Sequence, residues 1–406
     1  MPAVLTNFIR TTPLGREAGE LLRACVHCGA CKSTCPTFLL LNDELDSPRG
    51  RIYLMKMVLE GRLAPTYETV VHLDRCLNCR NCEAVCSSGM HYGAMLDIGR
   101  SLIESQVERP WRERLARALV RDVIPYPARF TPLLRLGQLL RPLLPGALKR
   151  KVPARQRATA WPAPRHARTM LVLEGCAQPA IAPNINAATA RVLDRLGISL
   201  VRAANAGCCG ALHQHTSDTV GALDFARRNI DAWWPYIEAG CEAIVMTASG
   251  CGLFVKEYGY QLRHDPAYAA KAKRVSELTR DLSEILVRED FARLKTGIQA
   301  GTKVAFHPPC SLQHGQRLNG IVEKILTDLG FVLTEVPDKH LCCGAAGSYS
   351  LLQPELSNQL KRNKVVALES GQPAVIVTAN VGCLTHLQSG STVSMRHWVE
   401  LIAPAS

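Results

Sequence analysis

Two runs of four cysteines with the same spacing restrict the fold of this chain more than any other feature. Both runs follow the pattern C-x-x-C-x-x-C-x-x-x-C. The first consists of Cys25, Cys28, Cys31 and Cys35, and the second of Cys76, Cys79, Cys82 and Cys86. Three thiols in such tight series can bind one face of a cubane, whereas the fourth thiol points away from it. The two runs therefore predict two 4Fe-4S clusters near the start of the chain.

The runs resemble those of bacterial two-cluster ferredoxins, in which the fourth cysteine of each run ligates the other cluster. The resemblance implies one cluster on Cys25, Cys28, Cys31 and Cys86, and a second on Cys76, Cys79, Cys82 and Cys35. Such crossed ligation would couple cluster binding to the folding of this region. The alternative is two four-cysteine zinc sites, but these normally use two separated C-x-x-C pairs, so the spacing favours iron–sulfur clusters.

The cysteine content also bears on the compartment. Seventeen cysteines among 406 residues would suggest disulfides in a small secreted protein, but this chain is far longer than such scaffolds. Residues 1–22 carry scattered charges and lack the apolar core of a signal peptide. We therefore expect a cytoplasmic protein whose clustered cysteines bind metal. No stretch of eighteen apolar residues predicts a membrane span.

Residues 109–168 separate the N-terminal cysteines from the remaining nine. This segment has fifteen Lys or Arg, only two acidic residues and frequent prolines, a composition that predicts an extended basic connection. Within it, residues 129–148 mix leucines with arginines. They could dock on the anionic inner membrane face or on a partner subunit. Their prolines argue against a long amphipathic helix, which favours the partner surface.

The C-terminal half contains an internal duplication. Cys176, Cys208, Cys209 and Cys251 recur as Cys310, Cys342, Cys343 and Cys383, at offsets of 134, 134, 134 and 132 residues. Each copy contains Cys-Cys-Gly and alternates strand with helix patterns. The predicted strands include residues 170–173, 243–247, 304–306 and 374–378. This alternation is typical of an α/β unit with a parallel sheet, whose cysteines would converge on one sheet edge.

These patterns predict an α+β multidomain protein. The N-terminal region has no strand pattern, and Ser47-Pro48 is expected to open a helix that continues through Leu59. The expected parts are an α-helical ferredoxin-like domain (1–108), the basic Pro-rich connection (109–168), a first Cys-Cys-Gly repeat with a helical extension (169–299) and a second repeat (300–406).

The Cys-Cys-Gly repeats resemble the cysteine-rich domain of heterodisulfide reductase and its relatives. In that family the pattern ends in C-x-x-C and supplies five thiolates to an unusual cluster. Here the copies end in Cys251-Gly-Leu-Phe254 and Cys383-Leu-Thr-His386, so each has four cysteines. Disulfide reduction at a five-thiolate cluster is therefore not expected.

Four thiolates can still hold one further cluster. The second copy is the stronger candidate for a third centre, because His307, His314 and His386 lie beside Cys310, Cys342, Cys343 and Cys383. The set Cys176, Cys208, Cys209 and Cys251 is the weaker candidate. The alternative is that these thiols are small buried residues that pack the sheet edge. Cys241 has no counterpart in the other copy, starts a predicted strand and is expected to belong to the core.

Taken end to end, the chain resembles the iron–sulfur subunits of glycolate oxidases. The stretches that carry this resemblance are LRACVHCG (22–29), DELDSPRGRIY (43–53), LVLEGCAQP (171–179), NIDAWWP (229–235) and TASGCG (247–252). The general layout is shared with subunits of lactate-utilisation complexes and anaerobic glycerol-3-phosphate dehydrogenase.

The resemblance implies an electron-transfer subunit with no catalytic residue of its own. Partner subunits carrying FAD would oxidise glycolate to glyoxylate, and this chain would pass the electrons toward quinone, as a cytoplasmic subunit held peripherally at the inner membrane. The alternatives are a related lactate or glycerol-3-phosphate dehydrogenase subunit, or a Cys-Cys-Gly centre that itself reduces quinone or a disulfide. Nucleic acid is not expected as a partner, because the basic segment lacks interleaved aromatics and a reader fold.

Overall fold

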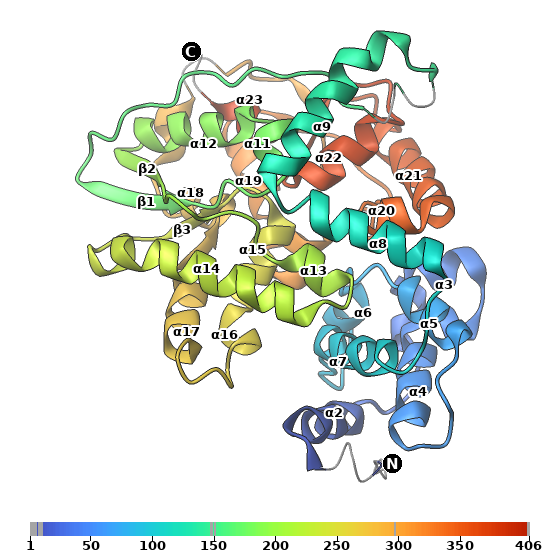
Figure 1. The fold of residues 1–406 in the computed structure, drawn as a ribbon. Helices are drawn as coiled ribbons and strands as arrows, with labels where there is room; N and C mark the ends of the chain where they lie inside the picture. The colour runs from blue at the N-terminus through green and yellow to red at the C-terminus, as the bar shows by residue number, and fades with distance from the viewer. Residues whose placement is uncertain (1–5, 7–10, 147–148, 150–151, 296–297, 404–406) are drawn as a thin grey trace.

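The computed structural model describes residues 6, 11–146, 149, 152–295 and 298–403. A small helical domain lies beside a larger α/β part, and the α8–α9 helix pair runs from the N-terminal domain across the α/β part (Figure 1). The expected α+β multidomain architecture is confirmed. Among the described residues, no helix is both long and apolar enough to span a membrane.

The N-terminal domain is built from short helices without strands. They are α2 (Pro13–Ala24), η1 (Ala30–Thr34), α3 (Pro36–Leu41), η2 (Glu44–Asp46), α4 (Pro48–Leu59), α5 (Tyr67–Asp74), α6 (Asn81–Ala84) and α7 (Tyr92–Glu104). The predicted helix after Ser47 is confirmed as α4, because the Ser47 hydroxyl accepts a hydrogen bond from the Gly50 amide at 2.9 Å and Pro48 fits the first turn. Met55 of α4 and Met95 of α7 are fully buried in the core of this domain.

The connecting segment is not extended as predicted. It forms α8 (Trp111–Val123), α9 (Pro127–Leu140) and the short η3 (Arg141–Leu143) before the chain continues without regular structure from residue 153. The prolines permit this because Pro127 lies in the first turn, where its missing amide hydrogen is not needed, and only Pro132 lies inside the helix. Residues 147–148, at the end of the expected docking segment, lie outside the described residues.

Each Cys-Cys-Gly repeat contains a four-stranded parallel sheet. The strand orders are β2-β1-β3-β4 and β6-β5-β7-β8, so the two repeats share one topology. The strands are β1 (Arg168–Val172), β2 (Ile198–Arg202), β3 (Ile244–Met246), β4 (Thr279–Asp281), β5 (Lys303–His307), β6 (Val332–Leu333), β7 (Val375–Thr378) and β8 (Met395–His397). The edge strands β4 and β8 were not predicted, because they are short and carry charged residues in place of an apolar run.

Helices cover both faces of each sheet. In the first repeat they are α11 (Gln178–Ile181), α12 (Asn184–Arg195), α13 (Ala211–His215), α14 (Thr219–Glu238), α15 (Ser249–Lys256), α16 (Tyr258–Gln261), α17 (Ala269–Leu278), α18 (Leu282–Leu286) and η4 (Phe291–Leu294). In the second they are η5 (Ser311–Gly315), α19 (Ile321–Asp328), α20 (Tyr349–Leu352), α21 (Pro354–Glu369), α22 (Val381–Gln388) and α23 (Val399–Ile402).

The two repeats pack against each other as a pair. One hydrophobic cluster contains buried residues from both, including Ile185 of α12 and Val399 of α23. Polar contacts reinforce the junction: the Ser249 and Ser311 hydroxyls lie 2.8 Å apart, and the His397 ring contacts the Thr247 carbonyl oxygen at 2.9 Å. The two repeats therefore share one hydrophobic core.

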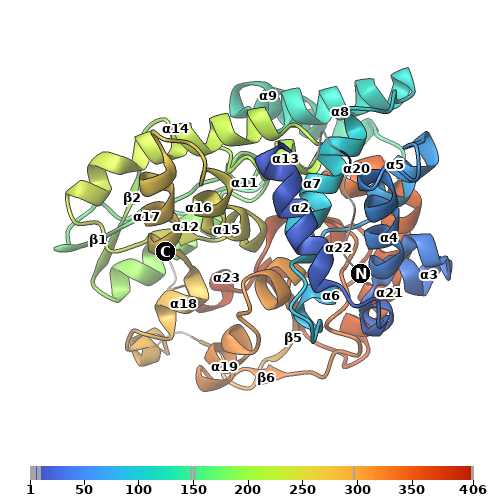
Figure 2. The same cartoon turned by 90° about the horizontal axis from the view of Figure 1, so that it is seen from below.

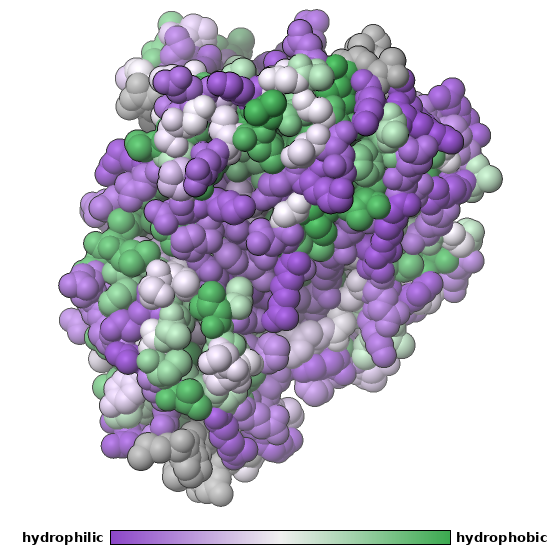
Figure 3. Space-filling model, turned by 180° about the vertical axis from the view of Figure 1, so that it is seen from behind, coloured by the Kyte–Doolittle hydropathy of each residue, from purple (hydrophilic) through white to green (hydrophobic). Residues whose placement is uncertain are grey.

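The N-terminal domain contacts both repeats. In both views α3 and α5 lie near α20 and α21 of the second repeat (Figures 1 and 2). On the other side, α2 and α7 face the first repeat, where Arg80 forms an ion pair with Glu257 and Arg263 with Glu17. The face opposite to that of Figure 1 is mainly hydrophilic, with hydrophobic residues in small separate groups (Figure 3).

Candidate metal centres

The two N-terminal cysteine runs share an unusual backbone. His27 and Gly29 have positive φ angles of 55° and 84°, and so do Asn78 and Arg80, with 50° and 58°. In each run these residues lie two and four positions after the first cysteine. Left-handed residues at alternate positions turn the chain tightly, which lets the three thiols of a run face one centre.

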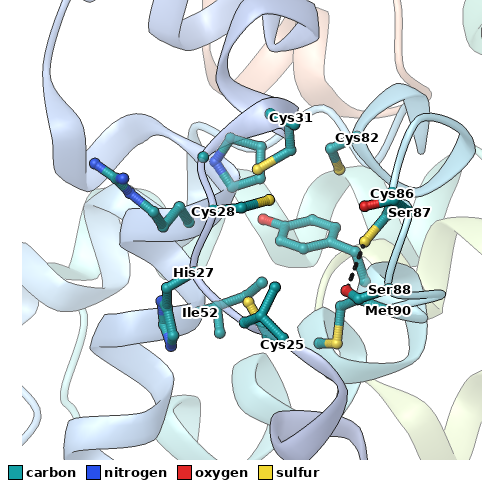
Figure 4. A pocket seen from close by; sticks show the side chains of 16 residues that line it. Cys25, His27, Cys28, Cys31, Ile52, Cys82, Cys86, Ser87, Ser88 and Met90 are labelled. Carbon is teal, nitrogen blue, oxygen red and sulfur yellow. Dashed lines mark hydrogen bonds between the residues drawn. The ribbon is translucent and has the colours of Figure 1, made fainter.

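Five cysteines line one pocket, namely Cys25, Cys28, Cys31, Cys82 and Cys86 (Figure 4). All of them except Cys82 are the thiols that the crossed pattern assigns to one cluster. Cys28 is exposed and its neighbour Val26 is 68% exposed, so this pocket lies at the surface of the domain. Burial raises the pKa of the Cys31 thiol to about 11, with the Cys25 thiol adding to the shift. A metal would have to displace the proton from such a thiol.

Cys35, Cys76, Cys79 and Cys82 line a second pocket. It lies deeper, since Cys35 and Cys82 are buried. The two pockets share Pro48, Cys82 and Tyr92 as a common wall, so they adjoin each other. Two metal centres held by these thiols would therefore be neighbours.

Hydrogen-bond donors point at the sulfurs of the second pocket. The Tyr92 hydroxyl donates to Cys76 Sγ at 3.5 Å, and Arg51 Nη1 lies 3.8 Å from Cys35 Sγ. Arg51 is fully buried and forms an ion pair with Asp46 at 3.2 Å. Donors of this kind stabilise thiolate charge and tune the potential of a bound cluster. Sequence reasoning missed both side chains, since neither lies within a cysteine motif.

The cysteines of each repeat lie at the carboxyl ends of the strands, as expected. In the first repeat, Cys176 follows β1, the pair Cys208–Cys209 follows β2 and Cys251 lies at the start of α15, just after β3. The neighbouring Cys208 thiol and burial raise the pKa of Cys176 well above its ordinary value. Cys241 lies apart from this group, buried in the core, where its thiol contacts the Ala243 carbonyl oxygen.

The second repeat gathers its cysteines in the same way. Cys310 Sγ lies 3.8 Å from Cys342 Sγ, and the Gly344 amide donates to Cys342 Sγ at 3.4 Å. Hydrogen bonding with the Cys342 thiol, together with burial, raises the pKa of Cys310 well above its ordinary value. In the first repeat, the Gly210 amide makes the equivalent contact with Cys208 Sγ.

The three histidines predicted beside the second site have different roles. Only His307 joins the thiols: a ring nitrogen of His307 and the Sγ atoms of Cys343 and Cys383 all lie within 4.8 Å of one another. His314 instead contacts the His340 carbonyl oxygen at 2.9 Å. The His386 ring lies 3.3 Å from the Ser357 hydroxyl.

The second repeat brings its thiols next to the N-terminal domain. Leu77, Cys79, Cys310 and Cys342 belong to one apolar contact group. Burial raises the pKa of the Cys79 thiol, and the nearby Cys310 thiol adds to the shift. Asn81 of α6 also donates to the His340 carbonyl oxygen at 3.3 Å. The deeper ferredoxin-type pocket is thus adjacent to the second Cys-Cys-Gly site.

A buried lysine completes the second site. Lys364 is 3% exposed and donates to the Asp338 carbonyl oxygen at 2.7 Å. Burial lowers its pKa, whereas the thiols of Cys343 and Cys342 oppose that shift, which places the ammonium group near them. Sequence reasoning missed Lys364. Its position on the apolar face of α21, beside Leu360 and Leu368, was the available signal.

Comparison with known proteins agrees with this geometry. Residues 21–90 match the family described as a 4Fe-4S dicluster domain, and residues 170–256 and 304–388 each match the cysteine-rich domain. The fold and its thiol sites therefore define an iron–sulfur protein with a dicluster domain and two cysteine-rich repeats.

Full-length relatives narrow this class. The chain is 56% identical to the glycolate oxidase iron-sulfur subunit of Escherichia coli (strain K12), over all of this chain and 99% of that protein. It is 29% identical to the probable glycolate oxidase iron-sulfur subunit of Bacillus subtilis (strain 168), over 92% and 90%. Lactate utilization protein A of Bacillus velezensis is 31% identical, over 50% of this chain and 84% of that protein. The chain belongs to the family of glycolate oxidase iron–sulfur subunits.

Proposed function

We propose that this chain is the electron-transfer subunit of a flavin-dependent glycolate dehydrogenase. It accepts electrons from partner subunits that carry FAD and oxidise glycolate to glyoxylate, and it passes them toward quinone. The observation that carries this proposal is the placement of eight thiols around two adjoining pockets, one at the surface and one deeper. No residue of this chain is assigned a catalytic role.

The proposal assigns the ligands as the crossed pattern predicts. Cys25, Cys28, Cys31 and Cys86 hold the surface cluster, and Cys35, Cys76, Cys79 and Cys82 hold the deeper one. The lining of the two pockets supports this division. When bound, 4Fe-4S clusters accept and release single electrons. The chain's own part is to bury the deeper site and to direct Arg51 and Tyr92 at its sulfurs.

The α8–α9 pair is the proposed docking surface for a flavin subunit. Its exposed side chains include several leucines, namely Leu115, Leu119, Leu133, Leu136 and Leu139, and Leu143 of the following η3 is exposed as well. Arginines such as Arg112 and Arg129 flank them. Since α9 is a helix, the proline-based reason for preferring a partner over the membrane no longer holds. Exposed apolar surface flanked by cations suits an acidic, partly apolar protein face, and it also suits the inner membrane face.

Replacing exposed leucines tests this surface directly. In the L136S/L139S double variant, the flavin subunits should no longer co-purify with the chain, while its cluster content stays unchanged. If co-purification is unaffected and only recovery with membranes falls, the surface serves peripheral attachment to the inner membrane instead.

A second candidate substrate class follows from the relatives. The match to lactate utilization protein A supports an equivalent role in a lactate dehydrogenase complex, but it covers half of this chain. The full-length match to a glycolate oxidase subunit favours glycolate.

The central experiment is purification of the assembled complex under anaerobic conditions. Addition of glycolate should reduce paramagnetic iron–sulfur centres in this chain, and lactate should do so less well. Zinc in place of iron, or iron that glycolate leaves oxidised in the complete complex, would contradict the proposal.

A further inference from the structure

We infer that the second Cys-Cys-Gly repeat binds a polynuclear metal cluster with His307 as its nitrogen ligand, whereas the first repeat binds none. The sulfur ligands are Cys310, Cys342, Cys343 and Cys383. The inference rests on the proposed electron-transfer function and adds a third centre to it.

The imidazole of His307 lacks a hydrogen-bond partner. The side chain is 1% exposed, and neither Nδ1 nor Nε2 has a partner in the structure. An unpaired polar group at that depth is unfavourable, because it has lost its hydrogen bonds to water without gaining any in the protein. One ring nitrogen lies within 4.8 Å of both Cys343 Sγ and Cys383 Sγ, so a metal bound between them would use that nitrogen. Thiolate and imidazole are ligands that iron and zinc both accept.

The number and spread of the donors favour a cluster over a single ion. Four thiols and one imidazole make five donors, whereas structural zinc takes four in a tetrahedron. The thiols also form a continuous row: Cys310 and Cys342 are a pair at 3.8 Å, and the Cys343 thiol interacts with those of both Cys342 and Cys383. His307 joins this row beside Cys343 and Cys383. Donors spread along a row suit a centre with more than one metal atom.

The first repeat has the same thiols but a different wall. Leu173 occupies the position of His307, counted from the first cysteine, and Phe254 the position of His386, counted from the last. Both are buried, with 3% and 5% exposure. They pack with Cys209 in one hydrophobic cluster. Such a wall offers a thiolate-bound cluster neither a fifth ligand nor a compensating charge.

The two sites also differ in the charge around their thiols, and this difference again favours a cluster in the second repeat. Lys364 is buried on α21 near the second set of thiols. On α14, the buried polar residue is the neutral Asn229, whose side chain donates to the Cys208 carbonyl oxygen and to the Tyr258 hydroxyl and accepts from the Gly207 amide. A thiolate-rich cluster carries net negative charge, and a buried ammonium group lowers the cost of placing it in the interior. Among the described residues of the first repeat, no lysine or arginine is buried in this way.

The test compares iron content and nitrogen coupling in the full-length chain. The natural chain should contain more iron than the roughly eight atoms that two 4Fe-4S clusters supply. With ¹⁵N-histidine labelling, pulsed EPR should show nitrogen coupling to the additional centre. H307L should lose the additional iron and the coupling, and H307C should keep the iron without the coupling.

Two controls make the test specific. H314Q, in the same repeat, should keep both iron and coupling, because His314 bonds to a backbone carbonyl. C209S should keep all the iron, whereas its counterpart C343S should lose the additional iron. Where H307L does not fold, H307C decides between ligand and structural support.

Four results would overturn the inference. The natural chain could contain only about eight iron atoms, or the nitrogen coupling could persist in H307L. Alternatively, H307C could lose the additional iron, or C209S and C343S could lose equal amounts of iron. In each case the reducible clusters of the N-terminal domain would remain, and the proposed function would stand. Absence of all reducible iron would instead refute the proposed function.

Discussion

The two Cys-Cys-Gly repeats have one topology and four cysteines each, yet their sites are surrounded differently. In the first, Leu173 and Phe254 pack with the Cys209 thiol; in the second, His307 and Lys364 lie beside the thiols. Each copy has its own parallel sheet, and the two copies share one hydrophobic cluster. The comparison teaches that the same fold and the same four cysteines are not sufficient to define the site. The buried side chains beside the thiols decide what the site can bind.

The repeats also differ in how they meet the N-terminal domain. The second places Cys310 and Cys342 beside Cys79, within an apolar contact group. The first meets the domain through ion pairs, including that of Arg80 with Glu257. An apolar contact excludes water and brings two metal sites close, whereas a charged contact mainly orients the domains. We therefore expect the second repeat to matter for electron transfer and the first for assembly.

The largest effect should come from removing a thiol of the second repeat. In the C343S variant, the rate at which the complex reduces a quinone analogue with glycolate should fall by roughly tenfold to a hundredfold, because a proposed ligand is lost. The matched C209S variant should change this rate little. Steady-state assays on both complexes make the comparison, and equal losses would show that the repeats are functionally equivalent.

Removing the buried cation should have the next largest effect. K364M keeps the length of the side chain but loses a positive charge that favours an added electron. The potential of the second-repeat centre should fall by roughly 60 mV, a tenfold change in a one-electron equilibrium. Redox titration followed by EPR measures it.

The control for this change lies two residues away on the same helix. R362M removes an exposed charge from the same helix, and solvent screening should leave the potential nearly unchanged. A similar shift in K364M and R362M would mean that net charge matters and burial does not.

A smaller effect is expected where the first repeat meets the N-terminal domain. E257Q leaves Arg80 without its partner, and the two side chains are 13% and 23% exposed. The free energy of unfolding should fall by about 1–2 kcal/mol, between the values for surface and buried pairs. Denaturant titration measures this loss. E277Q, which breaks the exposed Arg274–Glu277 pair, should cost about 0.5 kcal/mol or less.

The smallest effect concerns pH at the same contact. Burial raises the pKa of Asp97 to about 6, although the Arg80 guanidinium opposes the shift. The folded state therefore binds a proton more readily than the unfolded state, and stability falls as pH rises from about 4 to about 6. D97N removes this fall. The Tm of D97N minus the Tm of the natural chain should therefore increase as pH rises over that interval. If the two Tm profiles run parallel, Asp97 is not the group that causes the fall in stability.

Much of the fold followed from local patterns. The strands before Cys176 and Cys310 are apolar runs, and the helix after Ser47 has a cap and a proline in its first turn, so their positions could be predicted. The helices α8 and α9 were missed because proline content was taken as a barrier, although only Pro132 is inside α9. The strands β4 and β8 were missed because three partly polar residues carry no periodic signal.

The candidate sites, like the fold, have features that the sequence predicts and features that it does not. Cysteine spacing is a local property, so the sequence alone determined which thiols can meet within each run and that the C-terminal half is duplicated. Three histidines near the second site were equally visible, and nothing in their spacing selected His307. That choice depends on which ring is left unpaired among the strands and loops of the folded repeat.

Only the tertiary structure decided the neighbours of each site. Arg51, Tyr92 and Lys364 reach the thiols from other helices, and Cys79 meets Cys310 across more than two hundred residues of chain. Such contacts depend on how domains pack, which no local spacing encodes. The chain therefore specifies its metal ligands through short-range sequence, and it specifies their charge environment and their order in space through packing between distant segments.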